Sequence, residues 1–267
     1  MATDTLWVFL VFAFAAEVIG TMAGFGAATI LTPVASFFMD IKTAVAVVAC
    51  FHLFGNASRL YFFGRHIRWK VVAQFGIPGV ACSFVGAKAA AWLPAHQVRI
   101  ILGGFLIVYA ALETLRLAQA HLPAPRTEVT PTSSHLKARQ AGVPATPATL
   151  LLGGVASGGV AGLIGTGGAI RSVCLLAFGL PKESYLGTSA LIALIVDATR
   201  LPVYVTQQFI PPTLLPMLVV LIGVAFCGAW LGQRLVRRVS PVGFKRFVLV
   251  MLVAMGVKLL VDGLRGL

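Results

Sequence analysis

Long hydrophobic stretches alternate with short polar or basic segments along the whole chain. Eight stretches approach the length of a membrane helix, and they cover approximately residues 6–22, 43–63, 71–92, 99–117, 148–164, 185–205, 214–235 and 247–261. A helix needs about 20 residues to cross the hydrocarbon core of a bilayer. Two shorter apolar runs, at residues 27–39 and 169–180, bring the total to ten. The pattern therefore predicts an all-α polytopic membrane protein with eight to ten helical membrane segments.

Two glycine clusters interrupt this hydrophobic pattern, one in each half of the chain. The first is Gly24-Phe25-Gly26 and the second runs from Gly165 to Gly168, and each is followed by one of the short apolar runs. Glycine weakens a helix, and irregular backbone at membrane depth is tolerated only where it lies inside the protein or lines a cavity. The two runs that flank each break either both cross the bilayer or form one re-entrant hairpin.

The two halves are predicted to be copies of one another. A shift of 141 residues places Gly24 and Gly26 on Gly165 and Gly167. The same shift places the stretch Asn-Ala-Ser-Arg-Leu at residues 56–60 on Asp-Ala-Thr-Arg-Leu at residues 197–201. We therefore expect three parts: a membrane repeat at 1–117, a linker at 118–146 that is rich in proline, serine and threonine, and a second membrane repeat at 147–267.

The distribution of basic residues predicts that the two repeats have inverted topology. The segment 64–70 is basic, whereas its counterpart at 206–212 carries no charge. The loop at 88–99 is weakly basic, whereas its counterpart at 234–246 is the most basic of the chain. Lysine and arginine collect on the cytoplasmic side, so corresponding loops are expected on opposite sides of the membrane. Each repeat then has a glycine-broken helix pair or hairpin plus three transmembrane helices. The linker is cytoplasmic, and the N- and C-termini lie outside.

Composition supports a protein embedded in a lipid bilayer. Of the 267 residues 58% are hydrophobic and 11% are charged, compared with about 25% charged residues in soluble domains. The net charge of +13 is explained by basic cytoplasmic loops, because no basic patch interleaved with aromatic residues argues for nucleic acid. The four cysteines lie in apolar stretches without a CxxC pair and are interpreted as core residues. We predict no metal and no cofactor.

Polar residues inside the apolar stretches give the candidate substrate site. Inverted repeats with helix breaks at matching positions are typical of secondary transporters, whose site lies near the bilayer midplane. Glycines expose backbone N–H groups, a helix that starts at a break presents its positive end, and arginine offers a bidentate fork for an oxyanion. Together these features favour a small anion. The predicted substrate-binding residues are Gly24, Gly26, Asn56, Arg59, Gly165, Gly167, Gly168, Arg171, Thr188, Ser189, Asp197 and Arg200.

Several of these residues also have a purely structural interpretation. The glycines allow close helix packing, and Arg171 has the length to extend toward the membrane surface. Asp197 and Arg200 are spaced to form an ion pair on one helix. Arg59 has Asn56 instead of an acid at that spacing, so we expect it to be the less neutralised of the two matched arginines. Hydroxyls such as those of Thr188 and Ser189 also bond to their own helix.

Glu17 and His52 are candidates for carrying a coupled proton. Both lie inside apolar stretches. A buried glutamate can titrate near neutral pH, and histidine does so without perturbation. A histidine that is simply satisfied in the core is the alternative for His52.

The motifs in order resemble the TauE/SafE sulfite exporter family. The resemblance rests on the two glycine-rich breaks, on the triplet Gly187-Thr188-Ser189 and on the two similar halves, and it covers nearly all of the chain outside the linker. Pro33 fits the proline that often follows the family's first glycine motif, whereas Cys174 stands at the second such position. The resemblance implies a multi-pass inner-membrane protein that exports sulfite, sulfoacetate or other small organosulfur or carboxylate anions.

The leading hypothesis is therefore a secondary transporter that works by alternating access, with the anion held between the two breaks. The alternatives are a non-transporting membrane scaffold or assembly factor and an intramembrane enzyme. We expect no enzyme, because Gly-x-Ser-x-Gly with a histidine base, HExxH and paired carboxylates are all missing from the sequence. The sequence leaves open the anion itself, the direction of transport, the coupling ion and the oligomeric state, with a homodimer as one candidate.

Overall fold

The computed structural model describes residues 3–23, 26–119, 146–235 and 241–266, and these residues form helices without any strand. Residues 120–145 of the linker predicted at 118–146 therefore lie outside the described residues, and so does Gly24. Helices of the first half are α1 (Thr3–Ala23), α2 (Ala28–Ala35), α3 (Ile41–Phe63), η1 (Gly64–His66), α4 (Trp69–Val71), η2 (Val72–Gly76), α5 (Ile77–Trp92) and α6 (Ala95–Gln119). Those of the second half are α8 (Pro147–Ile164), α9 (Gly168–Ala177), α10 (Lys182–Thr206), η3 (Pro212–Leu214), α11 (Leu215–Leu235) and α12 (Pro241–Leu264).

Each long hydrophobic stretch of the sequence becomes a helix, which confirms the predicted all-α polytopic membrane fold. Seven helical segments among the described residues are long and apolar enough to cross a membrane. One of them, from Trp69 to Trp92, joins α4, η2 and α5. Its π-helical turn precedes Pro78, which has no N–H to bond the carbonyl one turn earlier. Many exposed side chains of these segments are apolar, as at Val11, Val155 and Val219, which suits contact with lipid.

The helices that follow the glycine breaks are much shorter than the others. α2 has 8 residues and α9 has 10, so at about 1.5 Å per residue each reaches roughly half the thickness of the hydrocarbon core. α1 and α8, which precede the breaks, are long enough to cross by themselves. Each half thus begins with one long helix, a break, and one short helix.

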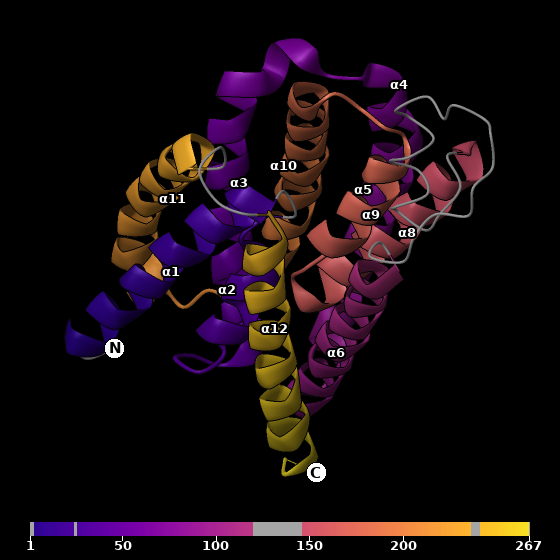
Figure 1. Cartoon of the computed structure of the whole chain (residues 1–267). Helices are drawn as coiled ribbons and strands as arrows, with labels where there is room; N and C mark the ends of the chain where they lie inside the picture. Colours follow the sequence, from indigo (N-terminus) through magenta and orange to yellow (C-terminus); the bar gives the residue numbers. More distant parts are fainter. Residues whose placement is uncertain (1–2, 24–25, 120–145, 236–240, 267) are drawn as a thin grey trace, which may run out of the picture.

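Helices of the two halves interlock (Figure 1). The closest packed pairs are α5 with α8, α1 with α11, α6 with α12 and α3 with α10, and every pair combines one helix from each half. If α1 corresponds to α8 and α5 to α11, the first two pairs are the same contact made twice. This packing is the one that a twofold relation between repeats predicts. The inverted orientation itself stays a prediction.

Small residues hold the α5–α8 pair at backbone contact. A Cβ added to Gly158 would lie 2.0 Å from the carbonyl oxygen of Gly79, and one added to Gly162 would lie 2.2 Å from that of Ser83. Glycine in these positions lets the two helices approach closely, as membrane helices often do.

Figure 1 places both chain termini in the lower half of the view. Which side of the membrane they face stays a prediction.

Candidate functional site

The two glycine breaks meet in the interior of the bundle. The hydroxyl of Thr29, at the start of α2, lies 2.7 Å from that of Thr166 in the second break. Gly26 and Gly165 both adopt a left-handed backbone, with φ of 88° and 83°, which glycine adopts without strain. The sequence predicted that the breaks approach each other, and the two threonine hydroxyls make that contact directly.

The glycines of the breaks also allow polar groups to approach the backbone. A Cβ on Gly26 would lie 2.3 Å from Nε2 of His52, so the imidazole packs directly against the first break. In the second break, the Ser157 hydroxyl donates a hydrogen bond of 2.8 Å to the carbonyl of Gly167. Gly168 is the first residue of α9. These predicted site glycines therefore shape the junction of the two halves.

A buried polar cluster joins α3 to α10 beside this junction. Nδ1 of His52 lies 2.8 Å from Oδ2 of Asp197. The amide nitrogen of Asn56 donates to the backbone carbonyl of His52 at 2.9 Å and lies 3.4 Å from the same carboxylate oxygen. All three side chains are buried. The structure thus brings together two predicted substrate-binding residues, Asn56 and Asp197, and the predicted proton carrier His52.

Arg59 extends the cluster to α1, and here one expectation from the sequence was wrong. Its guanidinium forms an ion pair with Glu17 and donates to Oγ1 of Thr21 at 3.1 Å and to Oδ1 of Asn56 at 2.9 Å. We expected Arg59 to be the less neutralised of the matched arginines because no acid lies one turn away on its own helix. The acid comes from another helix, and spacing along α3 cannot reveal it.

Arg200 is paired as the spacing predicted, and it also caps a helix. Two nitrogen atoms of its guanidinium contact the same carboxylate oxygen of Asp197: Nη2 lies 2.7 Å and Nε 3.0 Å from Oδ1. Nη1 donates to the carbonyl of Ala161, and the hydroxyl of Tyr204 donates to that of Gly162. These carbonyls belong to the last turn of α8, where a cation is favoured, and that of Ala161 also accepts the backbone N–H of Gly165. Arg200 therefore stabilises the end of the helix before the second break.

The two matched arginines play the same part in their halves. Arg59 reaches from α3 to α1, and Arg200 reaches from α10 to α8. In each half, the arginine ties the long helix that follows the break to the helix that precedes it. This shared geometry supports a structural role for both residues.

Arg171 differs from the other two buried arginines. It lies in the first turn and a half of α9, its side chain is 4% exposed, and Nε donates to the hydroxyl of Ser189 at 3.0 Å. Within the described part of the chain, no carboxylate forms an ion pair with it. It does not extend to the surface, so the interpretation as an arginine at the membrane edge is not supported.

Thr188 and Ser189 face different parts of the structure. Ser189 binds Arg171, whereas the hydroxyl of Thr188 accepts the backbone N–H of Arg68, which follows η1. Gly187 is packed against the carbonyl of Phe63. The triplet thus connects α10 both to Arg171 and to the basic segment at the end of α3.

The buried charges of this centre do not balance. Three guanidinium groups, those of Arg59, Arg171 and Arg200, face two carboxylates, those of Glu17 and Asp197. The buried Glu113 is paired with Arg116 at 3.0 Å and adds no excess. With His52 neutral, the buried groups of the described residues leave one positive charge in the interior. Charges in the membrane interior are expensive unless something polar compensates them.

Sequence reasoning missed Thr21, Thr29, Thr32, Thr166 and Tyr204. The first four lie within a few residues of a glycine break, and that position was the only signal available. Their hydroxyls have no match in the other half, so the repeat could not reveal them. A metal site finds no support in the described residues, where no suitable group of His, Cys, Asp and Glu side chains occurs.

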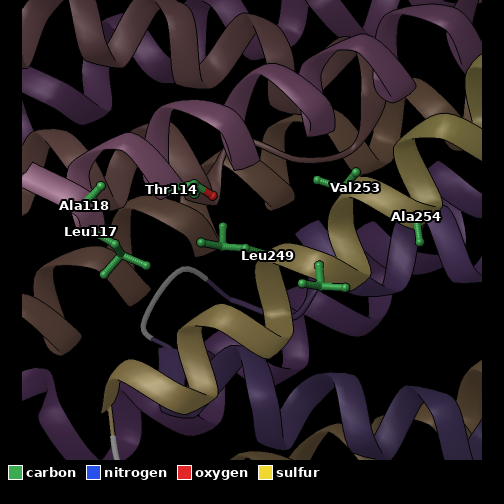
Figure 2. A pocket seen from close by; sticks show the side chains of 7 residues that line it. Thr114, Leu117, Ala118, Leu249, Val253 and Ala254 are labelled. Carbon is green, nitrogen blue, oxygen red and sulfur yellow. The ribbon is translucent and has the colours of Figure 1, made fainter.

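A separate pocket lies on the outside of the bundle between α6 and α12 (Figure 2). Its volume is about 660 Å³, and its lining includes Leu117, Leu249 and Val253. Among the described lining residues, the hydroxyl of Thr114 is bonded to the carbonyl of Ala110 at 2.7 Å. An apolar pocket on a lipid-facing surface offers nothing to an anion, so the candidate site remains at the junction of the breaks.

Membrane-length helices around a buried and positively charged centre define a multi-pass membrane protein of the kind that handles charged solutes. The family model described as "Sulfite exporter TauE/SafE" matches residues 8–259. The chain therefore belongs to the TauE/SafE sulfite exporter family, as the resemblance of its motifs predicted. Neither the curated proteins nor the solved structures contain a match to it.

Proposed function

We propose that this protein is a secondary transporter that exports small organosulfur or carboxylate anions, such as sulfite or sulfoacetate, across the inner membrane. Family membership supports an anion exporter. The observation that carries the proposal is the position of Arg171. It is buried in α9, four residues after Gly167 of the second break, and has no carboxylate partner among the described residues.

An unpaired arginine in the bilayer interior needs a reason to be there. An arginine at the centre of a membrane helix costs at least about 2.5 kcal/mol, even when the surroundings adjust. A transported anion would supply the missing negative charge for part of the cycle. The guanidinium fork of Arg171 and the N–H groups at the start of α9 would then bind its oxygen atoms.

Transport requires that this centre opens to each side in turn. Because α1 packs against α11 and α5 against α8, each moving body would contain helices from both halves. The contact of Arg59 with Glu17 and that of Arg200 with the carbonyl of Ala161 would stay closed during this movement, since each ties a long helix to its neighbour. The inside-negative membrane potential favours the exit of an anion by about 2.3 kcal/mol per charge at 100 mV.

His52 is the better of the two candidates for a coupled proton. Glu17 is fully buried and forms an ion pair with Arg59, so its negative charge is needed where it is. His52 contacts Asp197 on one side and the first glycine break on the other. A change in its charge would therefore act on both halves at once.

Flux in proteoliposomes tests the proposal. The purified chain is reconstituted, and the efflux of sulfite, sulfoacetate and simple carboxylates is measured against protein-free liposomes. We expect efflux of at least one of these anions, and we expect Arg171→Ala to abolish it. Arg65→Ala, which removes an exposed arginine, should transport normally. A chain that moves none of the anions would contradict the transporter function and favour a scaffold.

A further inference from the structure

Three buried hydroxyls converge where the two glycine breaks meet. Thr29 and Thr32 project from α2, and Thr166 lies in the loop between α8 and α9; all three are 0% exposed. Thr29 and Thr166 bond each other at 2.7 Å. The position that a Cβ on Gly165 would take lies 3.3 Å from Oγ1 of Thr32, so this hydroxyl faces the second break.

The hydroxyl of Thr32 has no hydrogen-bond partner among the residues that the structure describes. A buried hydroxyl without a partner costs about 1–3 kcal/mol. A threonine in a helix can avoid this cost by donating to a carbonyl of the preceding turn. Thr114 and Thr199 do so, with bonds of 2.7 Å to Ala110 and to Ile195. Thr32 makes no such bond, and a buried polar group without a partner calls for an explanation. A ligand that accepts its hydrogen bond would provide one.

The surroundings of these hydroxyls favour an anion over a cation. α2 begins at Ala28 and α9 at Gly168, so both short helices start within two residues of Thr29 or Thr166. The first turn of a helix carries unpaired N–H groups and a partial positive charge. Arg171, whose guanidinium is not paired with a carboxylate, lies in the second of these short helices, α9. Hydroxyl donors in a positive environment bind oxyanions well.

We infer that Thr29, Thr32 and Thr166, here called the threonine trio, bind the oxygen atoms of the transported oxyanion. The inference rests on the proposed function and assigns it three residues. The hydroxyls of Thr29 and Thr166 are close enough to bond each other and therefore close enough to bind oxygen atoms of one anion. When the anion enters, these two hydroxyls and that of Thr32 donate to its sulfite, sulfonate or carboxylate oxygens. The trio takes two residues from the first half and one from the second, so only the assembled junction provides the site.

Valine variants test the trio, because valine keeps the shape of threonine and removes the hydroxyl. Sulfite efflux from proteoliposomes is measured for Thr29→Val, Thr32→Val and Thr166→Val, for the corresponding serine variants, and for Thr199→Val as a control whose hydroxyl bonds only its own helix. The valine variants should raise KM for sulfite about tenfold, which corresponds to about 1.4 kcal/mol per lost contact, with little change in the maximal rate. The serine variants and the control should behave like the wild type.

A second measurement covers variants that reconstitute poorly. Sulfite should raise the melting temperature of the detergent-solubilised wild type and serine variants, and this shift should be lost in the valine variants. An unchanged KM and an unchanged shift in all three valine variants would overturn the trio while the efflux of the wild type upholds the proposed function. If the valine variants lost a sodium dependence of transport and kept their affinity for sulfite, the trio would be a cation site, which also contradicts the inference. Absence of efflux from the wild type would refute the proposed function itself.

Discussion

Nδ1 of His52 lies 2.8 Å from Oδ2 of Asp197, and this buried contact joins α3 of the first half to α10 of the second. The far side of the same imidazole is packed against Gly26 in the first break. Asn56 from its own helix shares the carboxylate, and Arg200 holds the other carboxylate oxygen from α10. His52 is therefore the one titratable ring that touches a break and both long central helices within the described structure.

The first prediction concerns proton coupling at His52. His52→Asn keeps an amide donor near the place of Nδ1 but cannot change its charge. We expect a pH difference across the liposome membrane to change sulfite efflux several-fold in the wild type and to leave the variant unaffected. His66→Asn, at an exposed position of η1, should respond like the wild type. An undiminished response in His52→Asn would exclude this histidine as the coupling group.

The second prediction concerns the ion pair between Glu17 and Arg59. Glu17→Gln leaves a buried guanidinium without its carboxylate, and breaking a buried pair from one side costs about 3–5 kcal/mol. The double variant Glu17→Gln with Arg59→Met removes both charges and should recover a large part of that loss. Unfolding of the wild type, of Glu17→Gln, of Arg59→Met and of the double variant in mixed detergent gives the coupling free energy between the two side chains. Additive effects of the two changes would show that the pair contributes nothing beyond its separate side chains.

Two neighbouring glycines of α8 provide the third prediction. A Cβ on Gly158 would lie 2.0 Å from the carbonyl of Gly79, whereas a Cβ on Gly159 would have no atom within 4 Å. Gly158→Ala should push α5 away from α8 and destabilise the protein by about 1–3 kcal/mol, as overpacking usually does. Gly159→Ala should be neutral or slightly stabilising, because alanine is the better helix former. Thermal unfolding compares the two, and equal effects would contradict the observed packing.

The fourth prediction concerns the inverted topology. Single cysteines are introduced at His66 and at Pro211 in a chain whose native cysteines are replaced by serine. Both positions are exposed and follow the long helices α3 and α10, which the repeat predicts to correspond between the halves. A membrane-impermeant thiol reagent should label the two positions from opposite sides of the membrane. Labelling of both from the same side would exclude inversion.

The helices and their breaks could be read from the sequence because lipid imposes a strict pattern. A membrane helix must be long and apolar, and a glycine cluster inside such a stretch stands out. The matched arginines at 59 and 200 were visible because identical residues recur at one spacing. The family motifs added the likeness to exporters, which the match over residues 8–259 confirms.

The partners of these residues could not be read in the same way. Glu17 reaches Arg59 from another helix, and no regular spacing connects them. The threonine trio lies near the breaks but has no counterpart in the other half, so the comparison of halves passed over it. The packing of α5 from the first half against α8 from the second depends on glycine contacts, which only the three-dimensional structure reveals.

Direct binding of sulfite tests the central claim that the unbalanced charge of Arg171 holds the anion. Calorimetric titration of the detergent-solubilised protein compares the wild type with Arg171→Ala, Arg171→Lys and the exposed control Arg65→Ala. We predict saturable binding in the wild type and the control, weaker binding in Arg171→Lys because the planar fork is lost, and no measurable binding in Arg171→Ala. Wild-type affinity for sulfite in Arg171→Ala would contradict the account.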